Sequence, residues 1–140
     1  MVTIEANREI NAPVENVWKV VSDVDKDPNY WSGLSSIRNL RKEGNVIERE
    51  VVVGFFNHRA KQTITLNPKQ SVELSMTKGP MIGKRVLNLA SVSGTAKTRL
   101  DVKWDFESSG IPVFARSFVK GRIEDTTKEA LDKIASAAER

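Results

Sequence analysis

The chain lacks the residues on which several common active sites depend. Its 140 residues contain no cysteine and a single histidine, His58. Disulfides, thiolate catalysis and cysteine-ligated zinc are therefore excluded, and so are a histidine pair and a histidine-rich metal site. The absence of cysteine also fits a reducing compartment. Carboxylate sites are not excluded, because the chain has 18 Asp and Glu residues.

Long apolar runs are missing as well. No segment approaches the ~20 apolar residues that a membrane-spanning helix needs. The first ten residues, MVTIEANREI, have no basic segment followed by an apolar one, so they do not resemble a signal peptide. We therefore expect a cytoplasmic protein without stable membrane insertion. The length predicts one domain with one core, residues 1–140.

Positive charge is in slight excess but does not form a block. The chain has 22 Lys and Arg against 18 Asp and Glu, a net charge of +4. The two signs alternate, as in IRNLRKEG and VIEREV, which is typical of a solvated surface. We therefore expect no nucleic-acid partner. The chain has no P-loop, HExxH, Rossmann or nucleophile-elbow motif, so we assign no cofactor, metal site or catalytic residue.

Two short helices are predicted in the stretch NAPVENVWKVVSDVDKDPNYWSG. Pro13 suits the first helical position, and apolar side chains then follow at helical spacing, with Trp18 expected in the core. Asp27 suits the N-cap of the second helix, with Pro28 at its first position and Gly33 at its end. Valine is only a middling helix former, so packing against a sheet must hold the first helix.

The rest of the chain predicts a sheet covered by one long helix. VTIEANREI alternates apolar and polar residues, and residues 34–107 form six further alternating runs separated by turn residues. Such connections favour antiparallel neighbours, with one apolar face that needs a cover. A helical period over some 25 residues after Pro112 provides that cover, interrupted by Gly121. Gly54, inside the third run, suggests a bend.

Three segments resemble the START-like, or SRPBCC, superfamily. They are REINAPVENVWKVVSDVDKDPNYWSG, KGPMIGKRVLNL and TRLDVKWDFE, and the resemblance extends over essentially the whole chain. The nearest group is that of polyketide cyclases/dehydrases and coenzyme-Q-binding proteins. The resemblance implies the α+β helix-grip fold of the birch-pollen-allergen type. In that fold a curved, seven-stranded antiparallel sheet wraps around a long C-terminal helix, and two short helices lie between strands 1 and 2.

The resemblance also implies an internal cavity between the sheet and the long helix. Trp31, at the corner after the second helix, and Met81, in a loop, are expected beside it. When the cavity lining of the family is transferred position by position to this sequence, its apolar residues are Phe55, Met76, Val102, Trp104, Phe114 and Phe118. For each of these residues, ordinary packing in the core is the alternative.

Two polar residues share faces with apolar ones. Arg49 lies on the same face of its strand as Ile47 and Val51, and Gln62 lies on the same face of the next strand as Ala60 and Ile64. An inward polar group needs a partner, which could be a protein carboxylate, a water or a ligand oxygen. A bend at Gly54 would instead turn Arg49 to solvent. His58 has no evident partner in the sequence and is expected in an exposed turn.

The function expected from this reading is binding or transport of a small hydrophobic ligand: a lipid, an isoprenoid quinone or a polyketide-like molecule. Arg49 and Gln62 would orient the ligand. One alternative is a cyclase or dehydratase acting on a polyketide-like substrate, for which the sequence offers no persuasive acid–base pair. Another is a chaperone- or ribosome-associated interaction module, which a cavity-free core would favour. The sequence leaves monomer and homodimer open.

Overall fold

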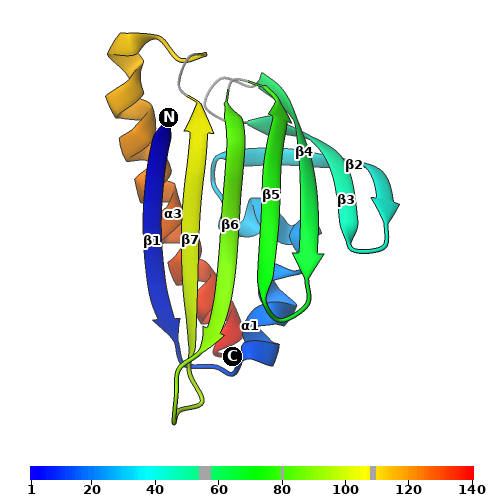
Figure 1. The fold of residues 1–140 in the computed structure, drawn as a ribbon, viewed down its shortest axis with the longest axis vertical. Coiled ribbons are helices and arrows are strands. Elements are labelled where there is room, and N and C mark those ends of the chain that lie inside the picture. The colour runs from blue at the N-terminus through cyan, green and yellow to red at the C-terminus, as the bar shows by residue number, and fades with distance from the viewer. Residues whose placement is uncertain (54–57, 80, 108–109) are drawn as a thin grey trace.

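The computed structural model describes residues 1–53, 58–79, 81–107 and 110–140. Within these residues the chain forms seven strands, with two short helices after the first and a long helix at the end (Figure 1). In order, the elements are β1 (Val2–Ile10), α1 (Val14–Val21), the 3-10 turn η1 (Val24–Lys26), α2 (Asp27–Tyr30), β2 (Leu34–Glu43), β3 (Val46–Val53), β4 (His58–Asn67), β5 (Ser71–Lys78), β6 (Ile82–Ser91), β7 (Thr98–Glu107), the 3-10 turn η2 (Val113–Ala115) and α3 (Arg116–Ala138).

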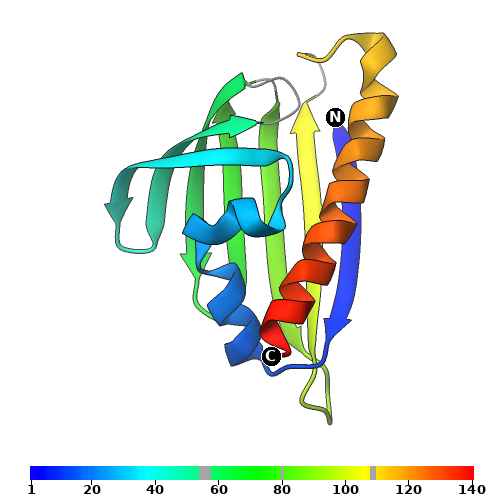
Figure 2. The same cartoon turned by 180° about the vertical axis from the view of Figure 1, so that it is seen from behind.

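The described strands form one antiparallel sheet in the order β1-β7-β6-β5-β4-β3-β2. From β2 to β7 each strand pairs with the next along the chain. β1 pairs with β7, so β1 and β2 are the two edge strands. The sheet curves, and α3 runs diagonally across one of its faces, with α1 and α2 beside it (Figure 2). This arrangement confirms the predicted helix-grip fold.

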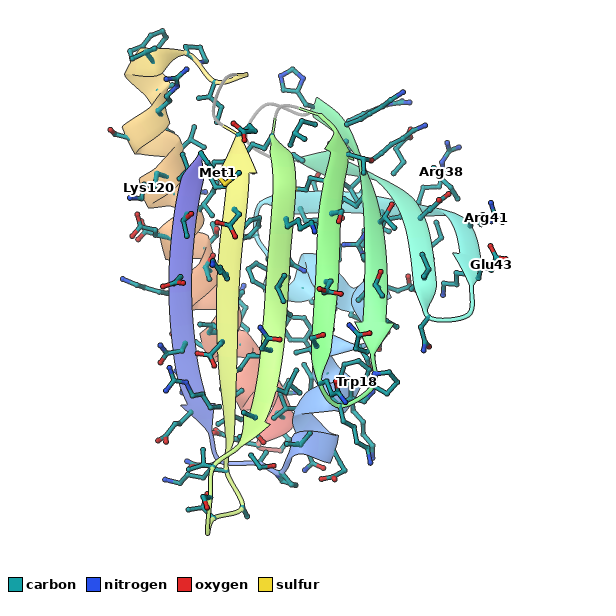
Figure 3. The ribbon with its side chains drawn as sticks, in the orientation of Figure 1. Met1, Trp18, Arg38, Arg41, Glu43 and Lys120 are labelled. Atoms are coloured by element: carbon teal, nitrogen blue, oxygen red, sulfur yellow. The ribbon has the colours of Figure 1, made fainter. Side chains whose placement is uncertain are left out.

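Alternation along the strands sets which side chains point inward. In β7 the five residues Thr98, Leu100, Val102, Trp104 and Phe106 are buried, while their neighbours are half-buried or exposed. The outward face is polar, as Arg38, Arg41 and Glu43 show on β2 (Figure 3). A one-residue slip would exchange these two faces, so burial of the apolar set holds the register.

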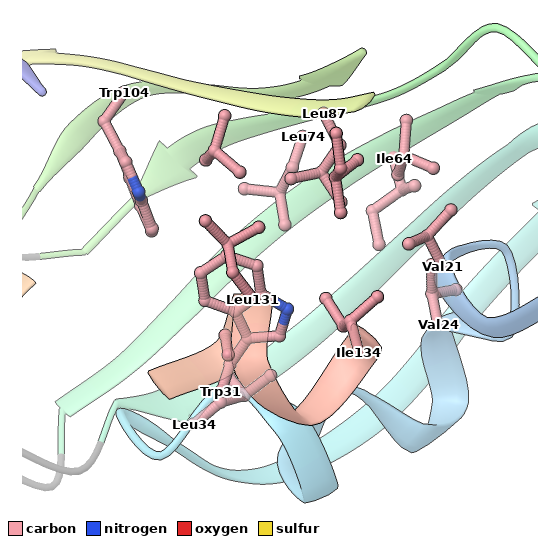
Figure 4. Packing of buried hydrophobic residues seen from close by; sticks show 14 of the residues in the cluster. Val21, Val24, Trp31, Leu34, Ile64, Leu74, Leu87, Trp104, Leu131 and Ile134 are labelled. Atoms are coloured by element: carbon pink, nitrogen blue, oxygen red, sulfur yellow. The ribbon is translucent and has the colours of Figure 1, made fainter. Parts of the chain in front are cut away.

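The core lies between the inward face of the sheet and the helices. Leu131 and Ile134 of α3 face buried leucines and an isoleucine from the strands (Figure 4). Val21 at the end of α1 and Val24 in η1 belong to the same core. Trp18 is half-buried and packs against the edge of this core. No helix in the part of the chain that the structure describes is long and apolar enough to cross a membrane.

Candidate functional site

The inward face borders a small cavity of about 70 Å³. It lies between the α2–β2 corner, the inward side of the central strands and the middle of α3. Its lining comprises Trp31, Gly33, Leu34, Val53, Gln62, Met76, Met81, Arg85, Trp104, Ile123 and Thr126. Most of these side chains are apolar. Of the charged groups in the described residues, the guanidinium of Arg85 is the one that reaches the wall.

Two tryptophans form one side of the cavity. The rings of Trp31 and Trp104 meet edge to face, with centroids 6.0 Å apart and planes at 76° (Figure 4). The indole Nε1 of Trp104 donates a hydrogen bond of 3.0 Å to Thr127 Oγ1. The hydroxyl of Thr127 donates in turn to the Ile123 carbonyl, at 2.7 Å. These bonds hold the indole of β7 against α3.

Arg49 lies directly behind this wall, with none of its surface exposed. Its Nε donates to Gln62 Oε1 at 2.9 Å, and its Nη1 donates to the Val24 carbonyl at 2.9 Å. Its Nη2 donates to Asp27 Oδ2 at 2.8 Å. Each of the three nitrogens therefore has a protein acceptor. Two of these acceptors belong to η1 and α2, so Arg49 ties the short helices to the sheet.

Asp27 does not cap α2 as the sequence suggested. It is the first residue of the helix rather than its N-cap, and no side chain among the described residues caps this helix by a hydrogen bond. The carboxylate turns inward instead, is 5% exposed, and accepts from Arg49. Burial raises the pKa of Asp27 above its ordinary value, and the guanidinium groups of Arg85 and Arg49 oppose that shift.

Arg85 is the second buried arginine, on the inward side of β6. It is 4% exposed, and its Nη2 lies 4.0 Å from Asp27 Oδ2. Its Cζ lies 4.1 Å from the ring centroid of Trp31 and 5.6 Å from that of Trp104. Within the described residues its Nε has no hydrogen-bond partner. Burial lowers the pKa of Arg85 to about 10, which Asp27 opposes, so the group stays charged at neutral pH.

Several predicted site residues do come together. Trp31, Gln62, Met76, Met81 and Trp104 all line the cavity. Val102 is buried on the inward face of β7 but lies outside the lining, and Arg49 is separated from the cavity by its own partners. The predicted lining residue Phe55 and the bend at Gly54 lie outside the described residues. His58 is the first residue of β4 and is exposed.

The placement of Phe114 and Phe118 is a correction. Both were expected to line the cavity, yet they are 90% and 71% exposed. Phe114 belongs to η2, which precedes α3. Within α3 the first buried position is Val119, and the next is Ile123, about one turn further along. Successive helical residues differ by about 100° around the axis, so Phe118 is turned away from the sheet.

The site also contains two charged groups that were not predicted to belong to it, Asp27 and Arg85. The sequence pattern could have identified Arg85, because it lies on the same face of its strand as Leu87 and Leu89. The same reasoning had identified Arg49. For Asp27 the signal was misleading, since an aspartate directly before a proline resembles a helix N-cap.

Three other hollows of the described surface, of about 520, 360 and 240 Å³, are lined largely by polar and charged side chains. The first of these is a groove between α2 and the C-terminal half of α3, lined by residues that include Lys26, Tyr30 and Lys133. Among the described residues no group of three His, Asp or Glu side chains is arranged to hold a metal ion. The cavity between the sheet and α3 is the candidate site, because its lining is mostly apolar and includes the buried cation of Arg85.

Residues 1–139 match the family described as polyketide cyclase/dehydrase and lipid transport. The chain belongs to this family. The match extends over all the segments on which the sequence resemblance rested. No curated protein matches the sequence.

Solved structures share the fold of this family member. The aromatase/cyclase Zhui from Streptomyces sp. R1128 superposes with a TM-score of 0.85 at 16% identity, covering 99% of this chain and 94% of that chain. A protein from Thermus thermophilus gives 0.82 at 17%, covering 98% and 97%. The di-domain aromatase/cyclase BexL gives 0.76 at 16%, covering 99% of this chain and 50% of that one. At these identities the likeness establishes the fold alone.

Proposed function

We propose that this polyketide cyclase/dehydrase family member binds a compact hydrophobic molecule in the cavity between the sheet and α3. The observation that carries the proposal is the composition of the cavity wall. The wall gets apolar and aromatic surface from Trp31, Trp104, Met76 and Met81, and polar groups from Gln62 and Arg85. Ligand sites typically combine an apolar wall with a few polar groups that orient the ligand.

The size of the cavity favours some ligands over others. Its 70 Å³ is well below the ~300–1,000 Å³ of typical ligand pockets. A ligand of polyketide or quinone-ring size would therefore have to widen it. Met76 and Met81 are suited to such widening, because an unbranched methionine side chain adapts to irregular shapes. A compact ring system needs less widening than a long lipid chain, so we place the polyketide-like class ahead of lipids.

Catalysis by a cyclase or dehydratase is the second candidate. Its support is Arg85, a buried cation that could stabilise an enolate formed next to it. Binding ranks first because a cyclase also needs a group that moves protons. In the described part of the lining no Asp, Glu, His or Tyr is available for that task.

A neutral fluorescent probe tests the proposal. We expect N-phenyl-1-naphthylamine to gain fluorescence on binding to the purified protein, and a hydrophobic ligand to appear in organic extracts. Met76→Trp should abolish probe binding, because the larger ring system would fill the cavity. Leu40→Trp is the matched control, since Leu40 is exposed on β2 and its substitution should leave binding unchanged.

Two outcomes would contradict the proposal. Equal binding to the wild type and the Met76→Trp variant would place the probe elsewhere on the molecule. Absence of binding to the wild type, together with empty extracts, would favour the interaction-module alternative. A cytoplasmic location and a lack of nucleic-acid binding remain predictions from the sequence.

A further inference from the structure

Arg85 lies in the cavity wall, and its Nε has no hydrogen-bond acceptor in the part of the chain that the structure describes. We propose that Arg85 binds an ionised oxygen of the ligand, that of a carboxylate, and that the molecule taken by the cavity is therefore a hydrophobic acid. This inference rests on the proposed function and specifies the chemical class of the ligand. It is carried by three features of the site: unused donors, unbalanced charge and the shape of the surrounding wall.

The first feature is the set of unused donors. A guanidinium has five N–H donors, all directed outward in its plane. In the described residues Arg85 Nε has no acceptor, and the distance of 4.0 Å from Nη2 to Asp27 Oδ2 is too long for a hydrogen bond. The guanidinium lies over the ring of Trp31, where a cation–π interaction attracts it, and the ring of Trp104 is also near. A π face attracts the charge without replacing acceptors in the guanidinium plane.

The second feature is the balance of charge. Asp27 already accepts a hydrogen bond of 2.8 Å from Arg49, which leaves Arg85 as the more distant cation. The two guanidinium groups and the one carboxylate of this described cluster leave an excess of one positive charge. Buried charge is costly unless it is paired. One anionic group beside Arg85 would both neutralise the cluster and supply the missing acceptor.

The third feature is shape. The planar fork of a guanidinium matches the two oxygens of a carboxylate, which it can bind through two parallel hydrogen bonds. Trp31 and Trp104 flank this position, and Met76 and Met81 line the same cavity. An apolar ring attached to the carboxylate would meet these side chains. The site therefore suits a planar acid, with its charge at Arg85 and its ring among the tryptophans and methionines.

A purely structural role for Arg85 makes a different prediction. If the long ion pair with Asp27 and the stacking on Trp31 were its purpose, Arg85→Met would destabilise the fold and leave ligand preference unchanged. If the donors serve a ligand, Arg85→Met removes an incompletely paired buried cation, and the variant should fold at least as stably as the wild type.

The test uses a pair of ligands that differ in charge and little else. Competition against the neutral probe N-phenyl-1-naphthylamine compares 2-naphthoate with its neutral amide, 2-naphthamide. In the wild type we expect naphthoate to bind at least about tenfold more tightly, as one charge-assisted hydrogen bond would give. In Arg85→Met the preference should vanish while the amide still binds.

Lys84→Met is the matched control. Lys84 is the neighbouring cation on the same strand, but its side chain lies on the exposed side of β6. It should keep the wild-type preference, because long-range attraction of the acid to surface charge is screened by salt.

A second readout keeps the test independent of how the variant folds. In the wild type, the ¹⁵N–¹H signal of the Arg85 Nε group should shift on addition of naphthoate and stay in place with naphthamide. Equal affinities of the wild type for acid and amide would overturn the inference, and so would a preference retained in Arg85→Met. In both cases probe binding would leave the proposed function intact. Failure of the probe itself to bind would overturn the proposed function and this inference with it.

Discussion

Replacement of Arg49 by methionine should separate the structural arginine of this site from the binding one. Arg49→Met removes a guanidinium that is entirely buried and leaves three buried acceptors without their donor: Gln62 Oε1, the Val24 carbonyl and Asp27 Oδ2. An unsatisfied buried polar group costs about 1–3 kcal/mol, and removal of one partner of a buried ion pair costs about 3–5 kcal/mol. These terms overlap, so we expect a total loss of about 3–5 kcal/mol.

Urea unfolding followed by far-UV circular dichroism measures this loss. With an m-value of about 1–3 kcal/mol per molar, the unfolding midpoint should fall by roughly 2 M. Arg38→Met is the control, because Arg38 is an exposed arginine of the neighbouring strand β2. Its Nη2 lies 3.6 Å from Glu50 Oε1, so it also forms an ion pair, but one on the surface. A surface pair of this kind contributes about 0–1 kcal/mol. A loss below about 1 kcal/mol in Arg49→Met would refute the view that this side chain holds η1 and α2 to the sheet.

The same variant has a pH dependence of defined sign. Burial raises the pKa of Asp27 in the folded protein, and Arg49 is one of the groups that opposes this rise. Without Arg49 the pKa should rise further, so the folded variant binds a proton that the unfolded chain has already released. Its stability should therefore fall as pH increases from the ordinary carboxyl value toward the raised one. The cost of Arg49→Met should be smaller at acidic than at neutral pH, and a cost independent of pH would contradict this assignment.

The remaining predictions concern α3 and the strand pair β6–β7, all measured by urea unfolding. Gly121→Ala should stabilise the protein by about 0.5–1 kcal/mol, because Gly121 lies inside α3 and a Cβ there meets nothing within 4 Å; a loss would mean that the helix needs glycine at this point. Gly83→Ala should be strongly destabilising, since its Cβ would overlap the carbonyl oxygen of Asp105 in the paired strand; tolerance would contradict the pairing of β6 with β7. Phe114→Ser and Phe118→Ser should each change stability by less than about 0.5 kcal/mol, as expected of exposed side chains; a loss of about 3–5 kcal/mol, typical of a core phenylalanine, would restore the original expectation that they face the interior.

The sequence predicted the fold well because the fold depends on patterns that repeat. Alternation in β7 gave the correct inward set, including Val102 and Trp104, and the order of strands and helices was correct throughout. Each such pattern rests on several residues, so one misread position does not change the result. Alternation in β3 favoured an inward Arg49, although a bend at Gly54 left its direction open. The structure places Arg49 inward, and its partners include one of those that the sequence allowed, a protein carboxylate.

The candidate site was harder to predict because it depends on single contacts between distant segments. Asp27 and Arg49 are 22 residues apart, and nothing local distinguishes an aspartate that caps a helix from one that turns into the core. Phe114 and Phe118 failed for a related reason. An apolar side chain in these segments can face the sheet or the solvent. Which of the two it faces depends on where η2 ends and α3 begins.

The short helices explain why two buried arginines on one sheet face can have different roles. Asp27 is the first residue of α2, and Trp31 directly follows its last residue. This one short helix therefore places both a carboxylate and an indole in the interior. The carboxylate lies closer to Arg49, at 2.8 Å, and the indole lies against Arg85. Arg49 thereby has a protein acceptor for each of its three nitrogens, whereas the Nε of Arg85 has no acceptor among the described residues. Pre-placement of this kind lowers the entropic cost of binding, because the side chain that meets the ligand is already ordered. A change that loosens α2, such as Arg49→Met, should therefore weaken acid binding as well as stability, although Arg49 itself does not line the cavity.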